Sequence, residues 1–414
     1  MHWHERAGRY IGTALKWLPL AAVVGALSGV LGAAFHGAIE VATAFRLAHS
    51  WTLYLLPVGA VVIFLFYKLC GIPSKMGTDL IIEAARSRKR VPLALVPAVF
   101  AGTVLTHFVG GSAGREGAAL QLGGGLGNWL GRVFRLKADE SHMITLCGMA
   151  AVFSALFGTP VTAALFVLEV TTVGSFYYAG LLPCLTAALT AFGVAGLLGA
   201  EPVRLAVAAG QALSAWNVLR IAGLGVACGA VSIGFCLSVE QGKHWARTLI
   251  TNKYIRGVIG GVIVLGLTLL VGTQRYNGAG MELVAEAVAG GEINWYDFLL
   301  KLLFTVITIA AGYRGGEIVP TFFVGAAFGA VFGPLLGLNA GLAAAVGMVA
   351  AFCGVTNCPV ASVFLGVEVF GGEYMLFFMV ACALSYVCSG YFSLYSSQTV
   401  AFSKVVAKPS ETDE

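Results

Sequence analysis

Charged residues are scarce in this chain: Asp, Glu, Lys and Arg together make up 11% of its 414 residues. Hydrophobic residues make up 58%, and the mean hydropathy is +0.87. From Ile318 to Val367, and again from Tyr374 to Ser403, there is no charged residue and no histidine. Both stretches exceed the ~20 residues that cross the hydrocarbon core of a bilayer. The composition therefore predicts an integral membrane protein.

Other features are missing as well. The sequence lacks the alternation of polar and apolar residues, in segments of about ten, that is typical of a transmembrane barrel. It has no His-Glu-X-X-His pair, and its nine cysteines are scattered, with Cys353 and Cys358 too far apart for a two-residue metal-binding spacing. We therefore expect an all-α fold with no metal site, no cofactor and no enzymatic activity, a membrane enzyme being the remote alternative.

The positive charges indicate the orientation in the membrane. Basic clusters at Arg86–Arg90 and Arg132–Lys137, together with a basic N-terminus, predict a cytoplasmic position for these regions. They are topology signals, and no nucleic-acid partner is expected. No cleavable signal peptide is evident. We expect a cytoplasmic N-terminus (1–13), a single transmembrane domain (14–402) and a short tail (403–414) without a regulatory domain.

Apolar stretches predict the membrane crossings. Before the first uncharged run they lie at 14–35, 52–70, 91–109, 143–168, 180–200, 216–237, 257–273 and 299–312. The uncharged runs are interrupted by Gly333-Pro334, Gly337, Asn357 and Pro359. Such interruptions predict short, broken helices whose freed backbone groups face protein or a cavity.

The chain also contains an internal repeat. Gly25 and Gly29 correspond to Gly225 and Gly229. The stretch 148–153 (Gly-Met-Ala-Ala-Val-Phe) returns as 347–352 (Gly-Met-Val-Ala-Ala-Phe). We therefore expect two related halves, at about 14–200 and 214–400. Repeats with interrupted helices are typical of transporters whose substrate binds at the repeat interface near the middle of the bilayer.

Glycine-rich helix starts are the candidate binding elements. They lie at Gly77-Thr78-Asp79, at Gly114-Arg115-Glu116-Gly117 and at Gly315–Pro320. The N-terminus of a helix carries unsatisfied N–H groups and about half a positive charge, so several such ends can bind an anion without a lysine or arginine. The sequence thus predicts an anion path.

These motifs, with the late Tyr395, resemble the CLC family of chloride channels and anion/proton antiporters. The resemblance extends from about Leu15 to Phe402 and is nearer the bacterial fluoride-exporting branch. Ile318 stands where the family usually has Phe, and Ala118 where Pro is common. The resemblance implies inverted-topology repeats, a homodimer in the bacterial inner membrane, and transport of fluoride or chloride with protons. A passive chloride channel of the same fold is the alternative.

The resemblance also assigns residues. It places the gating and proton-accepting carboxylate at Glu116 and a hydroxyl donor at Tyr395. The remaining anion-binding candidates are Gly77, Thr78, Asp79, Gly114, Gly117, Ile318, Val319 and Phe322. Independently of the resemblance, an ionised Glu116 at a helix N-terminus would block the anion site, whereas a protonated one would release it. Proton and anion binding would then exclude each other, which permits exchange.

Several roles stay open at this stage. Arg115 forms a structural ion pair with Glu116 or with Glu317. The motif glycines pair Glu116 with Ile318 across the two halves, although counting alone favours Glu317. Asp79 faces cytoplasmic water, caps the helix that follows or is protonated.

Six further side chains have one or two interpretations each. Glu201 is an inner proton site or a solvated loop acid. Glu169 and Glu368 end matching helices, which favours a scaffold role by capping or pairing. His107 relays protons or makes an ordinary buried hydrogen bond. Phe322, like its neighbour Phe323, presents ring edges to an anion or packs in the core.

Overall fold

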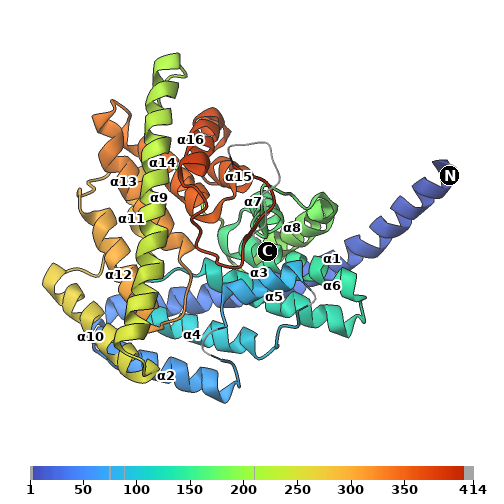
Figure 1. Ribbon diagram of the computed structural model, residues 1–414, viewed down its shortest axis with the longest axis horizontal. Helices are drawn as coiled ribbons and strands as arrows, with labels where there is room; N and C mark the ends of the chain where they lie inside the picture. Colours follow the sequence, from blue (N-terminus) through green and yellow to red (C-terminus); the bar gives the residue numbers. More distant parts are fainter. Residues whose placement is uncertain (1–2, 74–75, 88, 209, 405–414) are drawn as a thin grey trace.

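The computed structural model describes residues 3–73, 76–87, 89–208 and 210–404, and these fold into sixteen α-helices with very little strand (Figure 1). The helices are α1 (Trp3–Ala48), α2 (Leu56–Leu69), α3 (Thr78–Arg86), α4 (Leu95–Val109), α5 (Glu116–Val133), α6 (Ala138–Phe157), α7 (Pro160–Glu169), α8 (Leu181–Leu197), α9 (Ala215–Leu249), α10 (Lys253–Val271), α11 (Met281–Val288), α12 (Asp297–Ala311), α13 (Ile318–Leu335), α14 (Ala340–Thr356), α15 (Pro359–Phe370) and α16 (Met375–Cys388). Two strands, β1 (Thr172–Val173) and β2 (Thr399–Val400), pair in parallel. Short 3₁₀ segments lie at Ser50–Leu55, Tyr178–Gly180 and Gly372–Tyr374.

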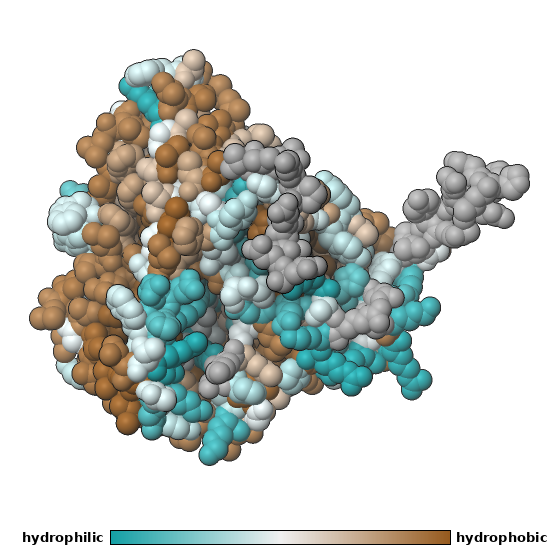
Figure 2. All heavy atoms as spheres, viewed as in Figure 1, coloured by the Kyte–Doolittle hydropathy of each residue, from teal (hydrophilic) through white to brown (hydrophobic). Residues whose placement is uncertain are grey.

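The described helices fit a membrane protein. Seven helical segments are long and apolar enough to cross a bilayer. Hydrophobic side chains cover the side of the molecule where α9, α10 and α13 lie, whereas hydrophilic ones gather in the lower middle and right of the same view (Figure 2). A helix surface that faces lipid is apolar because no water is there to solvate polar groups.

The sixteen helices divide into two sets of eight with matching contacts. The helix α1 packs on α6 and α8, and α9 packs in the same way on α14 and α16. The sets meet where α2 contacts α10 and where α7 contacts α15, and the first pair lies side by side at the lower left of Figure 1. The expected pair of repeats is therefore visible in the packing.

Glycines set the closest helix contacts, and they do so equivalently in both repeats. A Cβ on Gly123 of α5 would lie 2.1 Å from the carbonyl oxygen of Gly148 on α6. A Cβ on Gly325 of α13 would lie 2.4 Å from the carbonyl oxygen of Gly347 on α14. No side chain fits at such distances, so these helix pairs touch backbone to backbone.

Helix boundaries differ from the hydropathy estimate in one informative place. The apolar stretch 143–168 was expected to be continuous, but it divides into α6 and α7. Gly158 ends α6 with a φ of 69°, and Pro160 begins α7. The second repeat breaks in the same way, at Asn357 with a φ of 59° and Pro359. The predicted broken helices of the uncharged run are confirmed as α13, α14 and α15.

Candidate functional site

Two glycine loops, one from each repeat, meet at the centre of the molecule. Gly114 N donates to Gly316 O, and Gly316 N donates to Gly114 O, each over 2.7 Å. A Cβ on Gly316 would lie 2.4 Å from the backbone nitrogen of Gly117. The two loops can approach this closely only because both motifs supply glycine.

The pairing brings two helix N-termini together. The helix α5 begins at Glu116 with Arg115 as its N-cap, and α13 begins at Ile318 with Glu317 as its N-cap. Glu116 and Ile318 are therefore equivalent positions, as the motif glycines predicted. Neither N-cap side chain accepts a hydrogen bond from its own helix. The N-cap side chains thus leave the first N–H groups of both helices to another acceptor, which suits these groups to an anion.

The Glu116 carboxylate lies at this junction and is fully buried. Its Oε2 accepts a hydrogen bond of 2.9 Å from the backbone nitrogen of Arg115, while Oε1 accepts none from the described residues. A Cβ on Gly114 would lie 2.6 Å from Oε2 and 3.1 Å from Cβ of Val319. Gly114, Glu116 and Val319 therefore meet at one point, and the carboxylate occupies the helix N-terminus as a bound anion would.

The arginine of the first motif makes two polar contacts. Arg115 Nε lies 3.5 Å from Glu116 Oε1, and its Nη1 lies 2.6 Å from Nδ1 of His36 on α1. His36 in turn contacts Glu40 over 2.9 Å. Glu317 pairs with Lys243 of α9 over 3.0 Å. Of the two structural pairs considered for Arg115, the one with Glu116 is thus present.

A cavity of about 1000 Å³ opens beside this junction. Polar side chains and backbone line it from both repeats, among them Gly77, Thr78, Asp79, Gln121, Glu317, Tyr395 and Gln398. Its basic residues are Lys243, Arg247, Lys253, Arg256 and Arg314, against the acids Asp79, Glu240 and Glu317. The excess of positive charge favours entry of anions. We call this space the central cavity.

The motif Gly77-Thr78-Asp79 forms one wall of the central cavity. The helix α3 begins at Thr78 with Gly77 as N-cap, so the predicted helix start is confirmed. The Thr78 hydroxyl donates to Gly117 O over 3.3 Å, one residue from the buried carboxylate. Asp79 does not cap the helix: its Oδ1 accepts a hydrogen bond of 3.0 Å from Ser397 N. That acid anchors the chain segment that follows Tyr395.

Tyr395 also lines the central cavity, and its hydroxyl has no partner among the described residues. The side chain is 4% exposed. Its backbone nitrogen donates to Ser393 Oγ over 3.1 Å, and its carbonyl oxygen accepts from Gln398 N over 3.2 Å. The Gln398 side chain in turn donates to Val170 O and Thr356 O. The hydroxyl is therefore fixed in place and available to a ligand.

The segment after Tyr395 is tied to helix ends. The Lys404 ammonium donates to Tyr386 O over 2.8 Å and to Ser389 Oγ over 3.3 Å, at the end of α16. It also donates to Asn357 at the end of α14. A cation at helix C-termini complements their partial negative charge. Burial lowers the pKa of Lys404 to about 8.

The other predicted site residues lie apart from the cavity lining. Ile318, Val319 and Phe322 are fully buried at the start of α13. The ring of Phe322 meets those of Phe157 and Phe352 in edge-on contacts at 5.8 and 5.3 Å, so it packs in the core. Glu201 is exposed in the segment after α8 and does not line the central cavity.

Glu169 and Glu368 cap helices of the opposite repeat. Glu169, at the end of α7, accepts from Val360 N and Ala361 N at the start of α15 over 3.1 and 2.9 Å. Glu368 of α15 accepts from Val161 N and Thr162 N at the start of α7 over 3.1 and 2.7 Å. The predicted scaffold role is confirmed, and the exchange makes α7 and α15 antiparallel, as inverted repeats require.

Two residues of the site were missed from the sequence. Gln121 Nε2 donates to Thr78 Oγ1 over 3.2 Å and to Gly117 O over 3.1 Å, and so joins α3 to α5. The sequence indicated Gln121 only as a polar amide one turn after Gly117 in an otherwise apolar helix. Lys243 lies on a distant helix, and nothing in the sequence links it to Glu317. His107, by contrast, makes the ordinary contact considered for it, from Nδ1 to Thr103 O over 2.9 Å.

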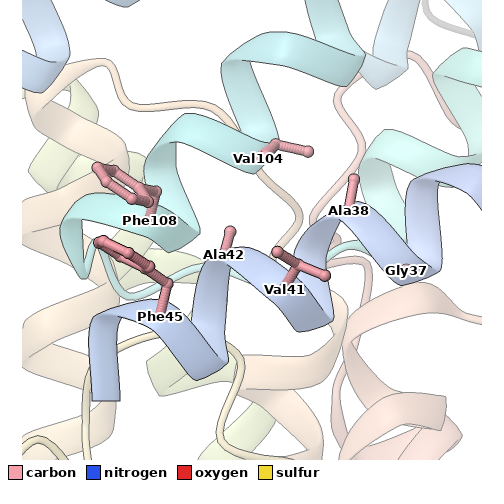
Figure 3. Close-up of a pocket in the computed structure, with 7 residues that line it drawn as sticks. All are labelled: Gly37, Ala38, Val41, Ala42, Phe45, Val104 and Phe108. Atoms are coloured by element: carbon pink, nitrogen blue, oxygen red, sulfur yellow. The ribbon is translucent and has the colours of Figure 1, made fainter. Parts of the chain in front are cut away.

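A second hollow lies on the outside of α1 and α4 and holds about 450 Å³. Figure 3 shows its lining of apolar side chains, with the rings of Phe45 and Phe108 stacked at 5.5 Å. No polar side chain lines it, so it offers nothing to an anion and suits contact with lipid.

Comparison with known proteins gives consistent matches. The family described as Voltage gated chloride channel matches residues 58–390. A chloride/fluoride channel protein of Pseudomonas syringae is 35% identical over 94% of this chain and 87% of its own length. An H(+)/Cl(−) exchange transporter ClcA of Yersinia pseudotuberculosis is 27% identical over 90% of this chain and 84% of its own.

Solved structures agree. The crystal structure of a CLC-type fluoride/proton antiporter matches with a TM-score of 0.90 and 35% identity, over 93% of this chain and 98% of the other. A slow cyanobacterial Cl−/H+ antiporter matches with a TM-score of 0.79 at 20% identity, over 90% and 93% of the two chains, which supports the fold alone.

Proposed function

Because this chain belongs to the voltage-gated chloride channel family, we propose that it exchanges a small halide, fluoride in preference to chloride, for protons. The preference for fluoride rests on the two relatives that are 35% identical and whose names include this ion. The multi-pass fold suits the bacterial inner membrane. One pathway per chain, in a homodimer, fits a central cavity that residues of a single chain line.

One observation carries the proposal: the buried Glu116 carboxylate occupies the junction of two helix N-termini. Ionised, it is held by the N–H of Arg115 and by the positive end of α5. Protonated, it loses its charge and with it most of that attraction. An anion can then take its place, since the N–H groups of α5 and α13 favour any negative charge.

The described contacts suggest the route between the cavity and the junction. Tyr395 and Thr78 line the central cavity, and the Tyr395 hydroxyl, which has no partner among the described residues, can donate to an anion. The Thr78 hydroxyl donates to an anion only once it releases Gly117 O. Gly77 and Gly117 provide backbone without side-chain bulk, and Ile318 and Val319 offer the first N–H groups of α13. Asp79 takes no direct part, because it holds the Tyr395 segment through Ser397. Phe322 supports α13 from the core.

Coupling follows from competition for one place. While the carboxylate is ionised and seated, no anion can pass, and each anion that enters requires Glu116 to have bound a proton. When the anion leaves, the Glu116 carboxylate returns to the junction and releases its proton on the opposite side of the membrane. A molecule without the carboxylate would lose the competition and let anions pass alone.

Flux through liposomes tests the proposal. Purified protein is reconstituted with an imposed fluoride gradient, and fluoride and pH are recorded on the same vesicles. We expect fluoride movement down its gradient to drive protons in the opposite direction, against their own gradient. Fluoride movement without protons in the unaltered protein would identify a passive channel, and a larger flux in a chloride gradient would reverse the assigned selectivity.

The variant Glu116→Ala tests whether this carboxylate carries the proton and controls anion entry. We expect proton movement to vanish while anion movement continues or changes in rate. Glu201→Gln is the matched control, since this exposed acid lies outside the cavity, and it should leave both fluxes unaltered. Unchanged proton coupling in Glu116→Ala would show that the carboxylate is not the proton carrier.

Subunit mixing tests the assembly. Light scattering in detergent should give twice the chain mass. Dimers that carry one intact chain and one Glu116→Ala chain should retain half of the coupled flux. A complete loss would mean that the two pathways are not independent.

A further inference from the structure

A group of polar side chains on one wall of the central cavity has no part in the exchange described above. Tyr67 of α2, Thr103 of α4 and Arg314, in the loop before α13, all line the cavity. We propose that they form a second halide site, in which an anion is held before it reaches the junction at Glu116. The role of this site in transport rests on the proposed function, whereas binding of the halide does not.

The two hydroxyl groups are the first observation. Tyr67 is 1% exposed and Thr103 is fully buried, and neither hydroxyl has a hydrogen-bond partner among the described residues. Buried hydroxyls are normally satisfied, because an unpaired one costs about 1–3 kcal/mol. Their position on the cavity wall means that a ligand in the cavity can supply the missing partner.

Comparison with neighbouring side chains shows that this state is unusual. Thr106 on the same helix donates its hydroxyl to Gly102 O over 2.9 Å, and Thr308 on α12 donates to Phe304 O over 2.7 Å. Tyr313, which also lines the cavity, donates its hydroxyl to Leu56 O. A threonine in a helix normally makes this local bond. Thr103 and Tyr67 therefore keep donors that similar residues have already used.

Arg314 supplies the charge. Its guanidinium lies over the ring of Tyr67, 4.2 Å from the ring centroid, and Nη1 donates to Met76 O over 3.3 Å. Gly102 makes the arrangement possible, because a Cβ there would lie 3.1 Å from both Arg314 Cγ and Tyr67 Cε2. The guanidinium is permanently positive, and these contacts fix it over the ring of Tyr67 in the cavity that Thr103 also lines.

These three groups fit a monovalent halide. Hydroxyl and guanidinium groups present hydrogens to an acceptor, and a halide ion is an acceptor with one negative charge. Two of the cavity's acids are already engaged, Asp79 by Ser397 N and Glu317 by Lys243. The site is distinct from the junction at Glu116, because its donors are side chains from α2, α4 and a loop rather than helix N-termini.

Anomalous diffraction tests the binding directly. Crystals of the full chain are soaked in bromide, and anomalous difference maps are compared between the unaltered protein and the double variant Tyr67→Phe and Thr103→Val. Tyr67→Phe removes the hydroxyl, and Thr103→Val replaces it with a methyl group of similar size. Tyr313→Phe is the matched control, because its hydroxyl is already bonded to the protein. We expect a bromide peak between Tyr67, Thr103 and Arg314 that persists in the control and disappears in the double variant.

Transport gives a second readout. Each lost donor should raise the half-saturating fluoride concentration at least about tenfold, as expected for one hydrogen bond to a charged group, with the proton-to-anion ratio unchanged. Absence of bromide at this position in the unaltered protein, or a peak that survives in the double variant, would overturn the inference. Crystallographic binding needs no transport, so a failure of the exchange mechanism is distinguishable from a failure of this site.

Discussion

The reciprocal carboxylate caps give the sharpest quantitative prediction. In Glu169→Gln, one carboxylate oxygen becomes an NH₂ group that faces a backbone N–H donor at the start of α15. One of the two charge-assisted hydrogen bonds of 3.1 and 2.9 Å is therefore lost, and the other becomes a neutral one. A hydrogen bond to a charged group contributes about 1.5–3 kcal/mol.

Desolvation works in the opposite direction. The Glu169 side chain is buried, and the amide costs less than the carboxylate to remove from water. We therefore expect a net loss of about 1–3 kcal/mol. Since 1 kcal/mol shifts the Tm of a domain of 150–250 residues by about 2–4 °C and the shift falls with size, the decrease for this chain should be about 1–5 °C.

The assay is thermal unfolding followed by helical circular dichroism in one detergent at one scan rate. Glu368→Gln should lower the Tm less than Glu169→Gln, because Glu368 is only half-buried and water can partly replace its bonds. Glu201→Gln, in an exposed segment, should leave the Tm unaltered. The reasoning is refuted if Glu169→Gln unfolds at the same temperature as Glu201→Gln.

Three further predictions concern the junction, the cavity and the tail. Gly316→Ala places a Cβ 2.4 Å from Gly117 N, so we expect loss of transport and a lower folded yield in size-exclusion chromatography. The control Gly193→Ala has open space around it and should be neutral or stabilising by about 0.5–1 kcal/mol. Equal behaviour of the two variants would contradict the close approach of the two glycine loops. Gln121→Leu removes the hydrogen bonds from the amide to Thr78 and Gly117. It should raise the half-saturating fluoride concentration about fivefold without altering the proton-to-anion ratio. An unchanged half-saturating concentration would exclude Gln121 from the site. Burial lowers the pKa of Lys404 to about 8, below its value in the unfolded chain. Between these two pKa values the unfolded chain binds more protons, so the stability of the unaltered protein should rise with pH above about 8 relative to that of Lys404→Met. A constant difference in Tm between the two proteins from pH 7 to pH 10 would argue against this.

Much of the fold follows from local patterns. Apolar stretches located the crossings because membrane helices must bury their backbone polar groups within themselves. Gly337, Asn357 and Pro359 mark real breaks: Gly337 lies between α13 and α14 with a φ of 75°, and Asn357 and Pro359 separate α14 from α15. Gly333-Pro334 does not, because Pro334 lies inside the last turn of α13. The break at Gly158 has the same signal, yet the unbroken hydropathy of 143–168 concealed it.

Pairing between distant segments needed the tertiary structure. Asp79 is next to a helix start, which in sequence suggests a cap, but its partner is Ser397 at the other end of the chain. Counting along the chain favours Glu317 as the counterpart of Glu116, whereas the motif glycines favour Ile318. The hydrogen bonds between Gly114 and Gly316 and the start of α13 at Ile318 support the glycines. The partner of Glu317, Lys243, belongs to a helix that the sequence marks only as a crossing.

The sequence by itself determined that this is a helical membrane protein of two repeats with a carboxylate, Glu116, at a glycine-rich helix start. Those properties depend on composition and on spacing along the chain, which is why they can be read locally. The tertiary structure alone decided that Glu116 lies where two helix N-termini meet, that Tyr67, Thr103 and Arg314 line one cavity, and that Glu169 and Glu368 cap each other's helices. Those facts depend on how two repeats fold against each other, and that arrangement brings together residues hundreds of positions apart.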